Sequence, residues 1–112
     1  MKSKRRKVLQ EYLGERKKFV ATVQNIRRDK NKLTLMDISI EIYGELQRVS
    51  YHMHITNVSK KYINNVKLYD VVYFTGIPYR YNKTDFYGNK IFNYSIRDIR
   101  DMKPLEVIFN EW

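Results

Sequence analysis

Two polar segments of the sequence combine basic and aromatic side chains in a pattern that suits contact with a nucleic-acid strand. They span residues 27–32 and 79–90, and each contains a single acid, Asp29 and Asp85 respectively. Basic groups neutralise phosphates and aromatic rings stack on bases, so their alternation fits a single strand. An ordinary solvated hairpin is the alternative for the second segment, but a plain turn has no use for four aromatic residues within nine positions. The basic and aromatic residues of the two segments are Arg27, Arg28, Lys30, Lys32, Tyr79, Arg80, Tyr81, Lys83, Phe86, Tyr87 and Lys90.

His52 and His54 are two residues apart, so on a β-strand their side chains share one face. Two imidazoles can contribute to a metal site, but the chain has no cysteine and no acid lies nearby on the same strand to complete a zinc site. We therefore expect no metal and no other cofactor. The pair is better interpreted as polar members of an exposed sheet face, where imidazole rings can stack on bases.

Catalysis finds little support in the residue pattern. The four glycines form no phosphate-binding loop, and no serine stands beside a plausible base and a third partner. Asp37 and Glu41 would share a strand face, where two carboxylates could hold Mg²⁺. A β-bulge at Asp37 explains an acid among apolar positions more simply. We expect a protein that is not an enzyme by itself.

The overall composition favours an anionic partner. The formal net charge is +10 at pH 7, and residues 1–18 contain eight bases and two acids. Ten tyrosines suit base stacking, but aromatic residues also suit pleated strands, so composition alone leaves a single-strand binder and an ordinary β-barrel equally open.

The same composition argues against a membrane or secreted protein. No apolar run approaches the roughly 18 residues of a membrane helix, and the basic stretch over residues 1–7 leads into no apolar segment of a secretory signal. The absence of cysteine excludes disulfides and fits a reducing cytoplasm, so we expect a cytoplasmic protein.

The elements that would position these residues follow from the apolar periodicity. Residues 2–14 have the spacing of a short helix, with Gly14 as a natural stop. From residue 17 the period becomes two, which predicts a strand. Further strands are expected over residues 33–41, 46–56, 71–81 and 91–97, a second short helix over residues 60–66, and a hairpin loop over residues 81–90. The chain then divides into a basic N-terminal segment (1–16), one β domain (17–103) and a C-terminal tail (104–112) that either packs on the domain or docks on a partner.

Three meandering strands, a short helix and a two-stranded hairpin are the element order of an OB-fold, a five-stranded, partly open, all-β barrel. An SH3-like barrel also has five strands but normally lacks the helix between strands three and four. Residues 68–76 resemble the G-D-x-V-x-F-x-A/G start of the fourth strand in OB-fold nucleic-acid binders, although Tyr69 replaces the usual glycine. Residues 94–99 resemble the Y-x-L/I-x-N/D-I segment that closes such barrels. In this fold, ligands lie across strands two and three, between the first–second and fourth–fifth strand loops.

The chain also resembles a replication family. Its composition, rich in Lys, Asn, Ile and Tyr, is that of a low-GC bacterium or its mobile elements. Within that group it is similar to the small middle proteins encoded beside a family A DNA polymerase in staphylococcal cassette elements. This resemblance implies a protein that binds the polymerase and lets it start primers.

These observations lead to three hypotheses of function. The first is a single-stranded nucleic-acid binding protein, with DNA as the favoured nucleic acid, that acts in replication of a mobile element. The second is an accessory subunit that binds a DNA polymerase and enables primer synthesis, and the third is a structural adaptor without nucleic-acid binding. The expected nucleic-acid-binding residues are Arg27, Arg28, Lys30, Lys32, His52, His54, Arg80, Tyr81, Lys83, Phe86, Tyr87 and Lys90.

Overall fold

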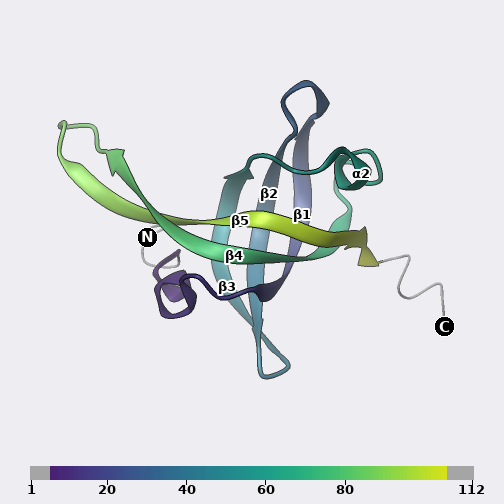
Figure 1. The fold of residues 1–112 in the computed structure, drawn as a ribbon, viewed down its shortest axis with the longest axis horizontal. Coiled ribbons are helices and arrows are strands. Elements are labelled where there is room, and N and C mark those ends of the chain that lie inside the picture. The colour runs from purple at the N-terminus through teal and green to yellow at the C-terminus, as the bar shows by residue number, and fades with distance from the viewer. Residues whose placement is uncertain (1–5, 106–112) are drawn as a thin grey trace.

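Five antiparallel strands form one sheet in the order β3-β2-β1-β4-β5 (Figure 1). The structure is a computed structural model that describes residues 6–105. The strands are β1 (Lys17–Arg27), β2 (Lys32–Ile42), β3 (Glu45–Ile55), β4 (Val71–Thr84) and β5 (Lys90–Pro104). Within the described residues, these strands are accompanied by the 3-10 turns η1 (Lys7–Tyr12) and η2 (Arg28–Lys30) and by the short helix α2 (Lys60–Ile63). The expectation of a mostly β chain with five strands is confirmed.

The central strand β1 holds the two halves of the sheet together because it pairs with both β2 and β4. The β4–β5 pair crosses over the other three strands, so the sheet folds back on itself around the core (Figure 1). The alternation expected along β1 is observed: Phe19, Ala21 and Val23 are buried. Phe19 stacks on Phe74 of β4 with ring centroids 5.4 Å apart, which joins the two halves through the core.

The strand β5 is bent by two β-bulges. At two places beside Thr75 it has one residue more than β4, and these places coincide with positive φ angles at Asp98 (54°) and Asp101 (56°). Asp tolerates this conformation better than most residues, and a bulge bends and twists its strand. Gly76 faces this bend, where an added Cβ would clash with Cγ2 of Ile96. A side chain at position 76 would therefore prevent the close approach of β4 and β5.

Arg16 stabilises the bend of β5 through contacts with Thr75 and Asp98. Its guanidinium donates to Oγ1 of Thr75 (2.9 Å) and to the carbonyl of Asp98 (3.0 Å), and it pairs with the Asp98 carboxylate. Arg100 approaches the same carboxylate at 3.2 Å. One acid at a bulge is thus held by two bases from different parts of the chain.

Only part of the helix expected over residues 2–14 can be compared, because residues 2–5 lie outside the described residues. Within the described part, the chain forms the 3-10 turn η1, which ends at Tyr12, two residues before the expected end. Its Leu9 is fully buried and Leu13 is exposed. Gly14 ends the turn with a φ of 78° and donates its N–H to the carbonyl of Pro78 at 3.0 Å, which docks η1 on β4. Tertiary contact at Leu9 and Gly14, rather than helical propensity, fixes this segment.

The helix α2 is also shorter than the expected range of residues 60–66. It is a single turn whose Ile63 is buried, and Val66 remains buried although it follows the helix. The core therefore holds the segment through both side chains without further helical turns. Across residues 6–105, none of the helices has the length and apolar character needed to cross a membrane.

The fourth and fifth strands extend well beyond the predicted ranges. The sequence predicts a loop over residues 81–90, but the pairs Tyr81–Asn93 and Lys83–Ile91 continue the ladder outward. Tyr81, Lys83 and Lys90 therefore lie on strands, and only residues 85–89 form the loop. We call residues 79–95 the arm; it projects away from the rest of the sheet (Figure 1).

Two aromatic residues are exposed although the period of two along their strands groups them with buried residues. Phe92 alternates in phase with Tyr94 and Ile96, but it is 61% exposed because the ladder at this point has left the core. Tyr51 alternates in phase with Val49, Met53 and Ile55, but it is exposed and its ring lies 5.2 Å from the guanidinium carbon of Arg48. Of the C-terminal tail, residues 106–112 lie outside the described residues, so the two alternatives for the tail stay predictions.

The docking of η1 yields a first prediction. Leu9→Ala should lower the free energy of unfolding by about 2–5 kcal/mol, because it removes a fully buried side chain and leaves a cavity. Leu13→Ala, in the same segment but exposed, should change it by less than about 1 kcal/mol. Urea denaturation, monitored by far-ultraviolet circular dichroism, measures the free energy of unfolding of each variant. A loss of less than about 1 kcal/mol in Leu9→Ala would show that η1 is not part of the core.

Candidate nucleic-acid interface

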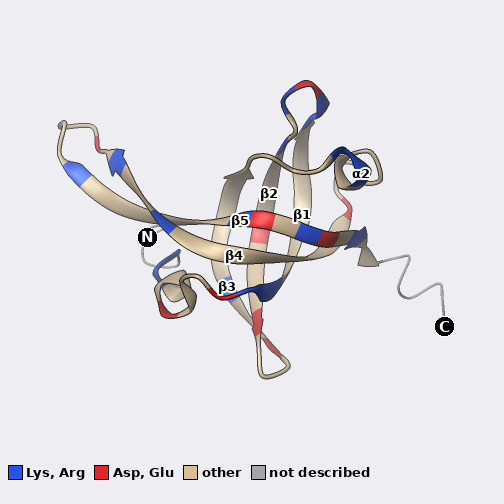
Figure 2. Ribbon diagram, viewed as in Figure 1, with Lys and Arg blue, Asp and Glu red and all other residues tan. Residues whose placement is uncertain are grey.

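The β1–β2 hairpin carries the first group of expected residues, and Figure 2 shows basic positions along the ribbon on both sides of its turn. Arg27 lies 3.6 Å from the carboxylate of Asp29, and Arg28 donates to the carbonyl of Val66 at 3.3 Å. Lys30 and Lys32 form no ion pair with any of the described residues. The two arginines thus partly serve the hairpin itself, while the two lysines keep their charge available for an anion.

The two histidines lie side by side on the outer face of β3, as the sequence predicts. Both are exposed, and their ring centroids are 5.0 Å apart in an edge-on arrangement. The register pairs His54 with Thr34 of β2, and the Thr34 hydroxyl lies 2.9 Å from Nδ1 of His54. Lys32 is two residues from Thr34 on β2 and therefore projects from the same face. The outer face of β2 and β3 thus brings together three of the expected residues, Lys32, His52 and His54.

The environment of His54 disfavours its charged form. Partial burial of the ring, followed by the positive charges of Lys32, His52 and Arg6, lowers the pKa of His54 below its ordinary value of 6.5. The groups whose charges lower this pKa are all basic, as is His54 itself.

Arg6 connects this outer face to the arm, and the sequence analysis missed it. Its guanidinium donates to the carbonyl of His52 (2.8 Å), to the Ser50 hydroxyl (3.4 Å) and to the Tyr81 hydroxyl (3.3 Å). The sequence had assigned residue 6 only to a generally basic segment. Its partners are 44 to 75 residues away, so no local pattern could have identified them.

One face of the arm presents two tyrosines. The Tyr81 hydroxyl accepts hydrogen bonds from Arg6 and from the side-chain amide of Asn93, at 3.2 Å in the second case. Tyr79 lies 6.0 Å from Tyr81 between ring centroids, and the Arg97 guanidinium carbon lies 5.4 Å from the Tyr79 ring. Basic and aromatic groups therefore alternate along this face.

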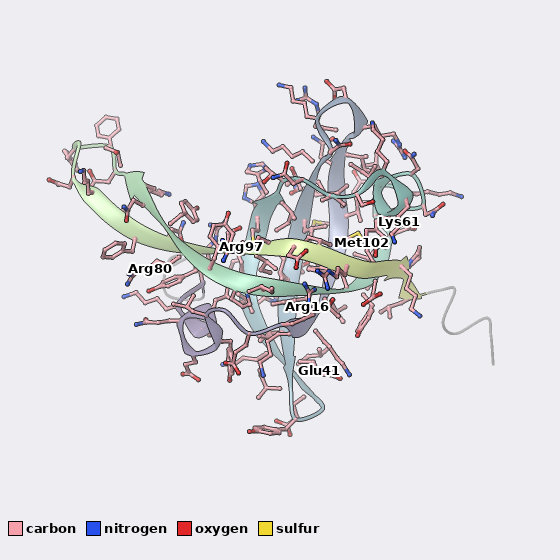
Figure 3. All side chains as sticks on the ribbon, viewed as in Figure 1. Arg16, Glu41, Lys61, Arg80, Arg97 and Met102 are labelled. Atoms are coloured by element: carbon pink, nitrogen blue, oxygen red, sulfur yellow. The ribbon has the colours of Figure 1, made fainter. Side chains whose placement is uncertain are left out.

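The opposite face of the arm carries a second pair of this kind. The register pairs Arg80 with Tyr94 and Asn82 with Phe92, so Arg80 and Phe92 lie on the face opposite to Tyr81. The Arg80 guanidinium carbon lies 4.4 Å from the Phe92 ring. Figure 3 shows Arg80 farther from the main sheet than Arg97. Phe92 is a candidate contact that is absent from the binding residues expected from the sequence.

The tip of the arm displays two exposed rings on an ordered turn. Phe86 and Tyr87 are 96% and 84% exposed, and their centroids are 5.5 Å apart in an edge-on arrangement. The Asp85 carboxylate accepts hydrogen bonds from the backbone N–H groups of Tyr87 and Asn89, both at 2.9 Å. These hydrogen bonds order the backbone of the turn that carries the two rings. The rings themselves do not cover any part of the core.

The expected residues fall into three connected places. Arg27, Arg28 and Lys30 lie at the β1–β2 hairpin, and Lys32 leads from it to the histidine pair. Arg6 then links His52 to Tyr81 at the base of the arm. The remaining residues occupy the arm and its tip, where Arg80 lies on one face and Tyr81 on the other. These are Arg80, Tyr81, Lys83, Phe86, Tyr87 and Lys90.

The two carboxylates considered for magnesium each have a basic partner. Asp37 lies at a bulge with a φ of 51° and pairs with Arg48 at 3.2 Å. Glu41 lies 3.9 Å from the ammonium of Lys18. Within residues 6–105, no group of three or more His, Cys, Asp or Glu side chains is placed to hold a metal ion.

Comparison with known proteins found no family model, no curated protein and no solved structure that matches this chain. Any function must therefore be argued from the geometry above. Its main features are bases without acidic partners, exposed aromatic rings, and the hydrogen bonds of Arg6 that connect the two.

The role of Arg6 can be tested directly. Arg6→Lys keeps the charge but cannot reach three acceptors at once, so it should loosen the base of the arm. Amide hydrogen exchange of residues 79–84 and 90–95 should accelerate about fivefold, the equivalent of the ~1 kcal/mol that one hydrogen bond contributes. Lys7→Gln, an exposed neighbour, is the matched control and should leave these rates unchanged. Unaltered exchange in the Arg6 variant would mean that the arm does not depend on this contact.

Proposed function

We propose that this protein binds single-stranded DNA along a surface that runs from the β1–β2 hairpin, over His52 and His54, to the arm. The observation that carries the proposal is the combination of exposed aromatic rings with bases that lack acidic partners among residues 6–105. A single strand needs both, because its phosphates are neutralised by bases while its bases stack on aromatic rings.

The strand arrangement supports this proposal. The element order, the pairing of β1 with both β2 and β4, and the helix between β3 and β4 resemble the arrangement of an OB-fold barrel. In that fold, single strands lie across strands two and three, between the first–second and fourth–fifth strand loops. We propose that the β1–β2 hairpin, the histidine pair and the arm serve as the corresponding ligand surface in this chain.

Single strands fit this surface better than duplexes. Stacking on Phe86, Tyr87 or Phe92 requires a base whose face is free, and in a duplex the faces are already stacked. A duplex would offer only its phosphates to the surface, which leaves the exposed rings without partners.

A second candidate function, the accessory subunit of a DNA polymerase, is favoured by a separate apolar patch. Leu68, Tyr69 and Val71 are exposed at the start of β4, which is the end of that strand opposite to the arm. Tyr69 is 70% exposed and has a φ of 69°, a conformation that is uncommon for a bulky residue. Such a patch suits a protein contact that leaves the strand-binding surface free. Co-purification with a neighbouring polymerase, and its loss in Tyr69→Ser, tests this candidate.

The charge of the surface predicts a strong salt dependence. Affinity for a fluorescent oligothymidylate should fall as salt rises, with log K decreasing by about 0.7 per phosphate contacted for each unit of log salt concentration. Fluorescence anisotropy between 50 and 300 mM salt measures the slope. A flat response, or tighter binding of duplex than of single strand, would contradict the proposal.

The tip of the arm predicts a separate loss of affinity. Replacing Phe86 and Tyr87 together with Ala should weaken single-strand binding at least about tenfold, since stacking contributes roughly 1–3 kcal/mol per ring. The melting temperature should barely change, because both rings are almost fully exposed. Tyr43→Ala, at the fully exposed β2–β3 turn, is the matched control and should bind as the parent does. If stability falls and binding persists, the rings belong to the fold rather than to the interface.

A further inference from the structure

We propose that Arg6, Lys32, His52 and His54 form a binding site for one phosphate group of the strand, and that His54 takes up a proton when the phosphate binds. The inference deepens the proposed function, on which it rests for the identity of the ligand. It adds a defined anion site and a regulation by pH to a surface so far described only by its charge and its rings.

The arrangement of the four bases supports an anion site. Lys32 and the two histidines project from the outer face of β2 and β3, and Arg6 is fixed at its edge by three hydrogen bonds to neutral acceptors. No ion pair to any of the four is formed within the described residues. By contrast, the acids at two β-bulges, Asp37 and Asp98, each pair with a base. The absence of such compensation here leaves one anionic group as the natural counterion.

The place of the cluster on the surface matches a backbone phosphate. It lies between the β1–β2 hairpin, which contributes Lys32, and the arm, which is linked to it through Arg6 and Tyr81. A strand that stacks a base on the arm and continues toward the hairpin must cross this face of β2 and β3. Its phosphate then meets the cluster, while the rings beyond Arg6 receive the bases.

The uptake of a proton by His54 follows from the charges around its ring. Without a ligand, burial and the charges of Lys32, His52 and Arg6 hold the pKa of His54 below 6.5, so the ring is mainly neutral at pH 7. A bound phosphate reverses the sign of the local field and raises the pKa of His54. Between the free and bound pKa values the complex holds more protons than the free protein, so affinity must increase as the pH falls.

Nuclear magnetic resonance tests the inference at the residue itself. The chain has only two histidines, so the titration of each ring can be followed by its own signals. In phosphate-free buffer, saturating oligothymidylate should raise the pKa of His54 by about one unit. A second titration with inorganic phosphate alone should raise the same pKa, and this distinguishes a site for the phosphate group from an effect of base stacking nearby.

Affinity measurements give the second readout. The parent protein should bind oligothymidylate about five- to tenfold more tightly at pH 5.5 than at pH 7.5. His54→Gln should reduce this ratio to about twofold or less. Lys61→Gln on α2, far from the arm in Figure 3, should change neither quantity. Melting temperatures confirm that the exposed substitutions leave the fold intact.

The outcomes separate the inference from the proposed function. If the strand binds but the pKa of His54 stays constant, or if the pH ratio survives in His54→Gln, the inference is wrong and the function stands. If no strand binds at either pH, the proposed function is wrong, and the titration with inorganic phosphate then decides. A raised pKa of His54 would retain the anion site, and an unchanged pKa would overturn both.

Discussion

The bend of β5 at Asp98 and Asp101 is the constraint on which the rest of the structure depends. Without two bulges, one strand could not close the sheet around the core and also continue into the arm. Gly76 allows the strands to approach at this point, and Arg16 holds Asp98 in place from outside the β4–β5 pair. The arm is therefore an extension of the core ladder rather than a flexible loop, and its side chains keep a defined register relative to the sheet.

Because the arm has a fixed position, residues that are far apart in the sequence lie together on one surface. An isolated two-stranded ribbon is marginally stable in water, so its base needs support from the rest of the fold. Arg6 supplies part of that support by joining Tyr81 to β3, and in doing so places its own charge beside the histidine pair. The tip meanwhile exposes Phe86 and Tyr87 to water, which no folding requirement explains. The physical interpretation is a surface prepared for a ligand with flat apolar faces and negative charges.

The sequence predicts the parts of this structure that face the core. Alternating apolar residues identify β1, and the same period of two places His52 and His54 on one face. Periodicity identifies no strand where the ladder leaves the core, because a ladder exposed on both faces has no one-sided burial and therefore no period of two. For this reason residues 81–90 look like a loop. Phe92 has the opposite problem, since it continues the period of Tyr94 and Ile96 beyond the point where that face is buried. Arg6 shows a second limit, since a side chain that binds partners 44 or more residues away leaves no local pattern.

The central claim is that one continuous surface, from the β1–β2 hairpin across His52 and His54 to the arm, receives a single strand. Mapping amide chemical-shift changes in the isotopically labelled protein during titration with oligothymidylate tests this claim most directly. The account predicts saturable changes at residues 28–32, at 50–54 and along the arm, with the β2–β3 turn and residues 68–71 unaffected. Changes centred on the β2–β3 turn or on residues 68–71, or no saturable change at all, would contradict it.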